Sequence, residues 1–407
     1  GVEKASKENQ YVGISQGTEG NIIVVGGNGS GKSAGIAIPT LRTWKEAICA
    51  TDVKGELSKC YEELFQKGTV TRPYIIFDPT QISGLSYDPF WWLLRDSEDN
   101  LLSNISEITF AIIPDTPNDN QPFWAETERA VFAAALLHYF SLGLSFSQTM
   151  CKITKSATSE LCEALKESED IRVKMLLGES ADMKSETLAS IDRGLRNKLV
   201  LFATDPHINH VFRGAREGAE RFTWDDLDTY NIFLRIPADK IEQWSGAINL
   251  MQTQLIRYLE RRPECYSEQG KDNVQTLLIL DEFARLGKLE IICDAIATLR
   301  SKNVNICLMV QSVAQLDYIY GEHRRRIIFD NCQYQIILRS NDAETQKYLS
   351  ELIGTKIHGR RSVSKQWNQH KEITGYGTQI GEVREWVIQP HELSRLNDVL
   401  LLAPQGF

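Results

Sequence analysis

The stretch "NIIVVGGNGSGKSAG", residues 21–35, places a short apolar run directly before four glycines that fall within six residues. The apolar run at 21–25 is typical of a buried strand, and the residues after Lys32 show a helical pattern to about Trp44. Residues 26–33 match the pattern G-x-x-x-x-G-K-[ST] at every fixed position. The order of strand, glycine loop and helix therefore predicts a phosphate-binding loop.

The residue types of this loop suit a nucleoside triphosphate. Glycines let successive backbone N–H groups turn inward around an anion without interference from Cβ atoms, and the helix that begins here adds its positive end. Lys32 would reach the β- and γ-phosphates, and the hydroxyl of Ser33 would bind Mg²⁺. The alternative, a glycine-rich turn with an incidental lysine, fits the flanking strand and helix poorly. We expect ATP to be bound by Gly26, Gly27, Asn28, Gly29, Ser30, Gly31, Lys32 and Ser33.

A second strand pattern, "TLLILDEF" at 276–283, ends in two carboxylates. Ligands of parallel sheets bind at the carboxyl ends of the strands, which is where Asp281 and Glu282 would lie. We expect Asp281 to hold the Mg²⁺ shell and Glu282 to act as the general base that activates water, which suits hydrolysis. The alternative is a solvated acidic pair at the start of a helix, where the helix dipole favours acids.

Two further polar residues are candidates for the same chemistry. Gln311 ends the next strand pattern, "VNICLMVQ", from which its side chain would contact the γ-phosphate or the attacking water. Arg300 lies at the end of the helix expected after Asp281, remote from the phosphate loop of its own chain. In a ring of copies it would face the neighbouring site as an arginine finger. The alternatives are a solvent-facing glutamine and a basic residue that favours a helix C-terminus.

The chain divides into an α/β part and a helical part. Residues 1–92 and 223–407 alternate strand and helix signals, which predicts a mainly parallel sheet covered by helices and formed by a discontinuous nucleotide-binding domain. Residues 93–222 show amphipathic helices with almost no strand signal, which predicts an inserted all-α domain. The expected strands are 21–25, 47–51, 74–78, 230–237, 276–283, 304–312 and 333–340, and the segment "EWVIQP…VLLLAPQ" is expected to complete the sheet.

Composition sets limits on the partners. The net charge of −9 excludes a generally basic nucleic-acid binder, so any DNA contact must be a local basic patch. The segment 354–379 is polar, basic and glycine-bearing, and we expect a long loop or a hairpin there. Its basic residues and the run "HRRR" at 323–326 are candidates for phosphate contacts, although solvated basic loops in an acidic protein are the favoured explanation. The eight cysteines form no CxxC, which favours reduced, buried thiols in a cytosolic protein.

Several stretches, in this order, resemble the type IV coupling proteins of bacterial conjugation and secretion, the TraG/TraD-type ATPases. They are "ATDVKGEL", "SYDPFWW", "QPFWAETERAVFAAALL", "LLILDEFARLGKLEII", "ATLRSKNVNICLMVQSVAQL", "FDNCQYQIILRSND" and "ELIGT", and the resemblance covers most of residues 20–407. It implies a RecA-like P-loop NTPase interrupted by an all-α substrate-recognition domain. It also implies that Lys32 and Ser33 match the Walker A pair, Asp281 and Glu282 the Walker B pair, and Gln311 the motif III glutamine. Arg300 matches the arginine proposed to act in trans.

The resemblance also implies partners and a location. Family members form homo-hexameric rings at the cytoplasmic face of the inner membrane and use ATP and Mg²⁺. They bring relaxase–DNA complexes, with single- or double-stranded DNA, or protein effectors to the proteins of a type IV secretion channel. The family usually has an N-terminal transmembrane segment, whereas only about 20 residues precede the first strand here. We expect such an anchor to belong to residues beyond this sequence, and the isolated fragment to be soluble and able to exist as a monomer.

Two other functions compete with a translocating ATPase. One is a nucleotide-gated substrate receptor with little motor activity, in which slow ATP turnover serves docking at the helical insert. The other is a DNA pump of the FtsK/HerA kind. The insert argues against the pump, since such pumps need no substrate-docking domain at that position.

Overall fold

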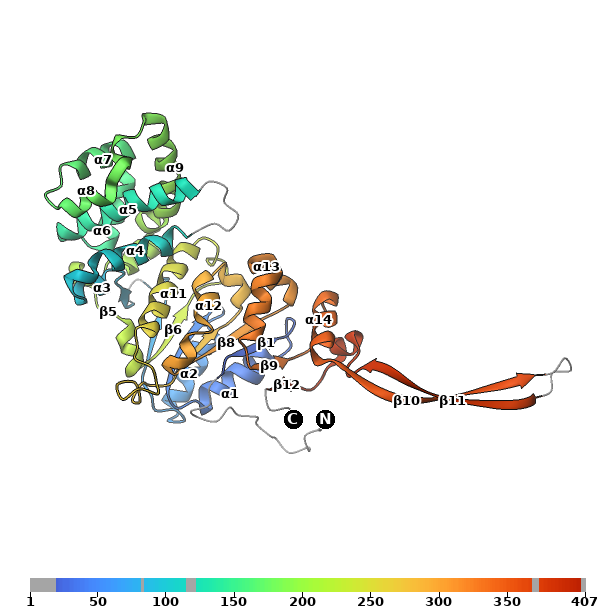
Figure 1. Cartoon of the computed structure of the whole chain (residues 1–407). Helices are drawn as coiled ribbons and strands as arrows, with labels where there is room; N and C mark the ends of the chain where they lie inside the picture. The colour runs from blue at the N-terminus through green and yellow to red at the C-terminus, as the bar shows by residue number, and fades with distance from the viewer. Residues whose placement is uncertain (1–19, 82–83, 115–121, 368–372, 404–407) are drawn as a thin grey trace. The chain divides into compact units, whose positions relative to one another are not determined.

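The structure is a computed structural model that describes residues 20–81, 84–114, 122–367 and 373–403 (Figure 1). Contacts within the chain group these residues into two compact units, and each is described by itself. The first unit contains residues 22–32 and the chain from 309 onward. The second contains residues 20–21 and 33–308.

The second unit is built on a parallel sheet. Its strands pair in the order β8-β7-β2-β6-β3, and every pairing is parallel. The three central strands are buried almost throughout, as expected where helices cover both faces of a parallel sheet. This confirms the mainly parallel sheet predicted from the alternating pattern. The strands are β2 (Ala47–Asp52), β3 (Tyr74–Phe77), β6 (Asn231–Arg235), β7 (Thr276–Leu280) and β8 (Val304–Val310), of which the last two residues of β8 fall in the first unit.

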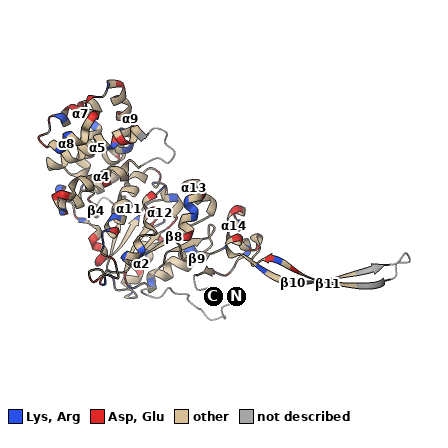
Figure 2. Ribbon diagram, viewed as in Figure 1, with Lys and Arg blue, Asp and Glu red and all other residues tan. Residues whose placement is uncertain are grey.

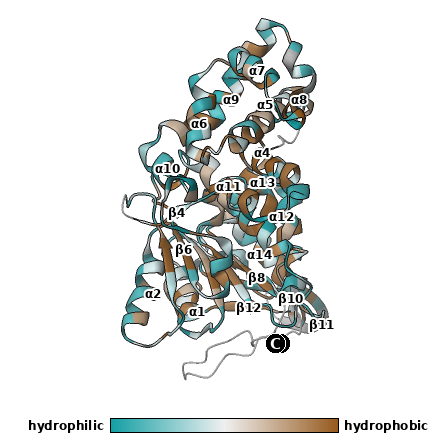
Figure 3. Ribbon diagram, turned by 90° about the vertical axis from the view of Figure 1, so that its left-hand side faces the viewer, coloured by the Kyte–Doolittle hydropathy of each residue, from teal (hydrophilic) through white to brown (hydrophobic). Residues whose placement is uncertain are grey.

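Helices cover both faces of this sheet (Figure 3). On one face, α2 (Glu56–Gln66) packs against β2 and β6, and on the other lies α11 (Ser245–Glu260). The single helix expected after Asp281, to about Ser301, was wrong. The chain instead forms η6 (Phe283–Leu286), α12 (Glu290–Ala295) and η7 (Leu299–Lys302). Gly287 at φ 84° takes the backbone out of the helical region and breaks the continuity.

Helices also make up the long excursion of the chain between β4 (Ser86–Tyr87) and β5 (Arg221–Phe222), two short strands that pair with each other in parallel. Helix α9 buries one stripe, as its spacing predicted: Leu188, Ile191, Leu195, Leu199 and Phe202. Charges of both signs are distributed along α7, α8 and α9 (Figure 2). The division at residues 92 and 223 into a motor and a substrate-recognition domain stays a prediction. The α-helices are α3 (Trp91–Arg95), α4 (Leu101–Ile112), α5 (Pro122–Ser141), α6 (Phe146–Lys155), α7 (Thr158–Lys166), α8 (Ile171–Leu177), α9 (Ser185–Thr204) and α10 (Pro206–Val211).

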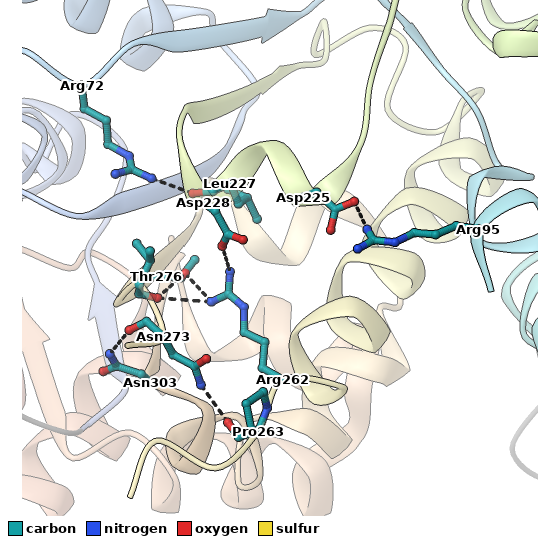
Figure 4. Close-up of polar contacts among 11 residues, drawn as sticks. Arg72, Arg95, Asp225, Leu227, Asp228, Arg262, Pro263, Asn273, Thr276 and Asn303 are labelled. Atoms are coloured by element: carbon teal, nitrogen blue, oxygen red, sulfur yellow. Dashed lines mark hydrogen bonds and ion pairs between the residues drawn. The ribbon is translucent and has the colours of Figure 1, made fainter. Parts of the chain in front are cut away.

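The return from these helices to the sheet is held by three arginines (Figure 4). The short helix η5 (Trp224–Asp228) receives a hydrogen bond from Arg72, an ion pair from Arg95 and an ion pair from Arg262. Arg262 also donates to the hydroxyl of Thr276 at 2.9 Å, at the start of β7. Because the three arginines come from separate parts of the chain, η5 is tied both to the helices and to the sheet.

The first unit contains a smaller group of strands. β1 (Ile22–Val25) pairs in parallel with β9 (Tyr334–Ile337), and β12 (Leu400–Leu402) pairs with β9 in the antiparallel sense. Two helices accompany them, α13 (Val313–Asp330) and α14 (Ala343–Ile353).

A long hairpin, β10 (Thr355–Trp367) with β11 (Ile373–Trp386), extends from the end of α14 (Figure 1). Of the two expectations for this segment, the hairpin is therefore the correct one. The expectation that "EWVIQP" completes the sheet was wrong for its first residues, because Glu385 and Trp386 belong to β11. Within the described residues of the two stretches, only those of β12 pair with the sheet, through β9. Lys371, one of the candidate phosphate contacts, lies outside the described residues.

The last two features considered are the cysteines and the possibility of a membrane-spanning helix. None of the eight cysteines forms a disulfide bond; five are buried and Cys151 is exposed. Among the described residues, no helix combines the length and the apolar character that crossing a membrane requires.

Candidate functional site

The phosphate loop begins where β1 ends, between two other strand ends of the first unit. The backbone N–H of Gly26 donates to the carbonyl of Val310 at 3.1 Å, and that of Gly27 donates to the carbonyl of Arg339 at 2.8 Å. A Cβ atom on Gly26 would lie 2.5 Å from Ser30 Oγ and 2.8 Å from Leu338 Cβ. Glycine is therefore required at position 26 by close packing.

The centre of the loop depends on backbone conformations that favour glycine. Gly29 and Gly31 have φ of 67° and 93°, left-handed values that glycine adopts without steric cost. Such values are typical of turns whose backbone amides bind anions. The ammonium of Lys32 donates to the carbonyls of Gly26 and Gly27 at 2.6 and 3.1 Å. Lys32 is thus buried against the loop, unlike an incidental surface lysine. Ser33 follows directly in η1 (Lys32–Ala37) and is half-buried.

Gln311 follows the end of β8, whereas the loop follows the end of β1. Gln311 follows Val310, whose carbonyl accepts the hydrogen bond from Gly26, so β8 delivers it beside the start of the loop. Its Oε1 atom accepts a long contact of 3.5 Å from Gln315, and the adjacent Ser312 caps α13. The described position agrees with the expected one. Its role toward a γ-phosphate stays a prediction.

The two carboxylates of the second unit follow β7 directly. The side chains of Asp281 and Glu282 belong to residues that are only 3% and 4% exposed, which excludes the alternative of a solvated acidic pair. Glu282 has φ 50°, a left-handed conformation that is uncommon for a non-glycine residue. Its N–H donates to Asp281 Oδ1 at 3.1 Å. The chain therefore turns sharply at this strand end and keeps both acids inside.

Two cations hold the Glu282 carboxylate. Lys54 Nζ lies 3.0 Å from Oε1, and Arg285 Nη1 lies 2.6 Å from Oε2. Burial opposes ionisation of Glu282, but the hydrogen bonds from Lys54 and Arg285 outweigh it and lower its pKa. The same contact raises the pKa of Lys54. Glu282 is therefore held ionised.

Asp281 has the opposite electrostatic environment. Burial, reinforced by the negative charge of Glu282, raises the pKa of Asp281 to about 6. A carboxylate destabilised in this way gains most from a bound cation, and oxygen ligands suit Mg²⁺. In the described part of the chain no three His, Cys, Asp or Glu side chains converge as a metal site. A Mg²⁺ ion at Asp281 would therefore complete its shell with a hydroxyl, phosphate oxygens or water.

From the sequence, the segment that carries Lys54, residues 52–56, entered only as part of the stretch "ATDVKGEL" and received no role. In the structure it is fixed by Asp52, whose Oδ2 accepts from the N–H and the hydroxyl of Ser58 at 2.8 and 2.7 Å. Arg235 at the end of β6 donates to the same hydroxyl at 2.8 Å. The signal available in the sequence was a lysine two residues beyond a strand that ends in a carboxylate.

Arg300 does not join Asp281 and Glu282. It is exposed in η7, shortly before β8 begins, whereas the two acids follow the end of the neighbouring parallel strand β7. Arg300 therefore lies at the opposite edge of the sheet from the acids of its own chain. A role in trans agrees with this placement and stays a prediction.

The sequence is similar to those of known proteins along almost its whole length. The family described as Type IV secretory system Conjugative DNA transfer matches residues 2–402. Protein VirD4 of Rhizobium rhizogenes is 25% identical over 397 residues, which are 95% of this chain and 56% of that protein. Conjugal transfer protein TraG of Escherichia coli is 21% identical over 392 residues, 90% of this chain and 60% of that protein. The chain thus spans little more than half the length of these relatives.

Solved structures show the same fold. The unbound conjugative coupling protein TrwBdeltaN70 aligns with a TM-score of 0.71 at 19% identity, covering 95% of this chain and 82% of that one. TrwB in complex with ADP and Mg²⁺ aligns with a TM-score of 0.68 at 18% identity, over 95% and 82% of the two chains. The predicted α/β fold of a RecA-like P-loop NTPase is thereby confirmed.

Proposed function

Because this chain belongs to the type IV secretory system conjugative DNA transfer family, we propose that it is an ATP-hydrolysing coupling protein. It would recruit relaxase–DNA complexes or protein effectors and drive their delivery to a type IV secretion channel.

The phosphate loop is the observation that carries the proposal. Gly29 and Gly31 give it the left-handed backbone typical of anion-binding turns, and carbonyls of the loop itself hold the ammonium of Lys32. A triphosphate would take over the charge of Lys32 and the inward-facing amides. TrwB, with the same fold, has been solved with ADP and Mg²⁺. We assign ATP as the nucleotide and Mg²⁺ as its metal.

The remaining residues receive roles by motif. Ser33 and Asp281 would hold Mg²⁺, which neutralises phosphate charge when bound. Glu282 would take the proton of the attacking water, and Gln311 would contact that water or the γ-phosphate. Arg300 would act on the nucleotide of a neighbouring copy, in a homo-hexamer at the cytoplasmic face of the membrane. The helices between β4 and β5 would receive the cargo.

Lys32→Ala tests the assignment of the nucleotide site. The substitution removes the charge that would meet the β- and γ-phosphates, so we expect ATP turnover to fall on the order of 100-fold or more. The measurement is phosphate release by the 407-residue chain with Mg²⁺, with a melting curve to show that the variant is folded. Hydrolysis that survived in the folded variant would contradict the assignment.

Adding single-stranded DNA at low salt separates the motor from the receptor. A translocating ATPase should be stimulated by DNA, and the stimulation should decline as salt rises, because phosphate contacts release counterions. Slow turnover that DNA leaves unchanged at every protein concentration would instead favour the nucleotide-gated receptor.

A further inference from the structure

The carboxylate of Glu282 is held from both sides, and the two cations differ in origin. Arg285 belongs to η6 and lies three residues further along the chain, so it contacts Oε2 through local geometry. Lys54 belongs to the segment between β2 and α2 and contacts Oε1. The pairing of β2 with β7 brings Lys54 to the acid, since Thr51 lies opposite Leu280 in that register. The contact between Lys54 and Glu282 therefore depends on the pairing of β2 with β7.

The segment that carries Lys54 is constrained on both sides. Before it, Asp52 is fully buried and anchors the first turn of α2 through Ser58. After it, Gly55 has φ 70°, and a Cβ at this position would lie 3.3 Å from the guanidinium of Arg235. These contacts fix the backbone that carries Lys54. From there its side chain, 41% exposed, reaches the buried carboxylate of Glu282.

The charges around Glu282 explain why such a contact matters. Asp281 adjoins it in the chain, and Asp52 at the end of β2 adds a further negative charge that acts on Asp281. Glu56 lies close enough to Lys54 to act on it electrostatically. Among these groups Lys54 and Arg285 supply the positive charge that balances the buried acids. Without Lys54, repulsion from Asp281 would favour other orientations of the Glu282 side chain.

The backbone conformation of Glu282 also indicates that the surroundings of this residue hold it in place. Glu282 adopts a left-handed conformation that a non-glycine residue keeps only where its surroundings enforce it. A carboxylate offers about four lone-pair directions, and the two cations need occupy only two of them. The contacts therefore fix the plane of the carboxylate and leave an acceptor direction for a water molecule.

We propose that Lys54 is a positioning residue for ATP hydrolysis, which holds the Glu282 carboxylate in the orientation from which it accepts a proton. The proposal rests on the function assigned above. In the step concerned, the water oxygen bonds to the γ-phosphorus, the bond from that phosphorus to the leaving oxygen of ADP breaks, and a proton of the water passes to Glu282. In this role Lys54 acts through its contact with Glu282.

Lys54→Met tests the proposal in the 407-residue chain with Mg²⁺ and ATP. We expect kcat to fall about 10- to 100-fold, because misplacement of a catalytic group by about 1 Å costs this much. The KM for ATP and the affinity for a non-hydrolysable analogue should stay within about two-fold, which separates this role from nucleotide binding. Lys54→Arg, which keeps the charge, should restore most of kcat. Lys59→Met, an exposed lysine on α2, is the matched control and should leave kcat unchanged.

A double substitution tests whether the effect passes through Glu282. In the Glu282→Gln background, Lys54→Met should change the residual single-turnover rate by less than about two-fold, because no carboxylate remains to be positioned. An undiminished loss in that background would overturn the proposal, as would a raised KM with normal kcat. A higher kcat would also overturn it, since Lys54 would then restrain Glu282. Should Lys54→Met fail to fold, Lys54→Gln carries the same expectations.

A failure of the proposal for Lys54 can be distinguished from a failure of the proposed ATPase function. If the wild-type chain hydrolyses ATP and Lys32→Ala does not, the ATPase assignment stands whatever Lys54→Met shows. If Lys32→Ala hydrolyses ATP as well as the wild type, the assignment of the site has failed before Lys54 is considered.

Discussion

The phosphate loop and the acidic end of β7 offer two ways of building a chemical site from a chain. The loop consists of consecutive residues, and its shape follows from glycine conformations and from a lysine that bonds to its own loop. The acidic strand end, Asp281 and Glu282, depends on cations and buried strands supplied by other segments. A site made of backbone can be recognised from a short motif. A site made of converging side chains acquires its electrostatics only when the sheet forms.

The largest expected effect distinguishes chemistry from binding. Glu282→Gln keeps the size of the side chain but removes the proposed proton acceptor, so kcat should fall on the order of 1,000-fold. Nucleotide affinity should stay within about two-fold, because we assign nucleotide binding to the loop. Single-turnover hydrolysis and titration with a fluorescent nucleotide analogue measure the two quantities. A loss of affinity as large as the loss of rate would break the division of labour between the two regions.

The next effect tests the claim that the loop is built from backbone. Gly31 has φ 93°, and no atom lies within 4 Å of the place that a Cβ would take, so Gly31→Ala would introduce conformational strain without a clash. We expect nucleotide affinity to fall about 100-fold, near the upper end of the cost of such strain, about 3 kcal/mol. Gly35→Ala is the control, because Gly35 has no positive φ and equal space around it. Equal affinity for both variants would show that the loop tolerates side chains.

The smallest expected effect is a change in the free energy of unfolding when Asp281, at the acidic end of β7, is replaced. Asp281 has a pKa of about 6 against an ordinary value of 3.8, so the folded chain binds this proton more tightly than the unfolded chain. The resulting stabilisation is complete below about pH 4 and is lost as pH rises through about 6. Asp281→Asn should therefore unfold with a free energy about 2 kcal/mol higher than wild type at about pH 7.5, in the absence of Mg²⁺.

Denaturant titrations of both proteins in a chelating buffer, at about pH 4 and about pH 7.5, provide the measurement. The difference between Asp281→Asn and wild type should disappear at the lower pH. A variant that is less stable than wild type at the higher pH would show that contacts of Asp281 outweigh the cost of burying its charge.

The sequence patterns predicted more of the fold than of the charge network. The strand before the glycine loop, the parallel sheet and the buried stripe of α9 follow from local periodicity and were confirmed. The helix expected after Glu282 was wrong because Gly287 breaks it, and a glycine within an otherwise helical pattern is a weak signal. The segment at 354–379 left loop and hairpin open, since its polar composition has no core-facing stripe to mark strands.

In the candidate site, too, local sequence patterns identified residues but not the contacts between distant segments. Lys32, Asp281 and Glu282 could be selected from the sequence, because their motifs are short and their flanking elements are regular. The burial of the two acids, the left-handed turn at Glu282 and the contact from Lys54 could not. They depend on which strands become neighbours. The "DVKGE" segment contained the relevant lysine, but nothing in its local pattern distinguished a contact with Glu282 from a solvated turn.

The sequence by itself determined a phosphate loop of defined residues, an α/β sheet and an intervening run of amphipathic helices, because each of these rests on contacts between residues close in the chain. Only the tertiary structure decided that β2 lies beside β7, and therefore that Lys54 meets Glu282 while Asp281 bears the cost of burial. Electrostatic interactions depend on distance and solvent exposure, and the sheet, which joins segments far apart in the chain, sets both.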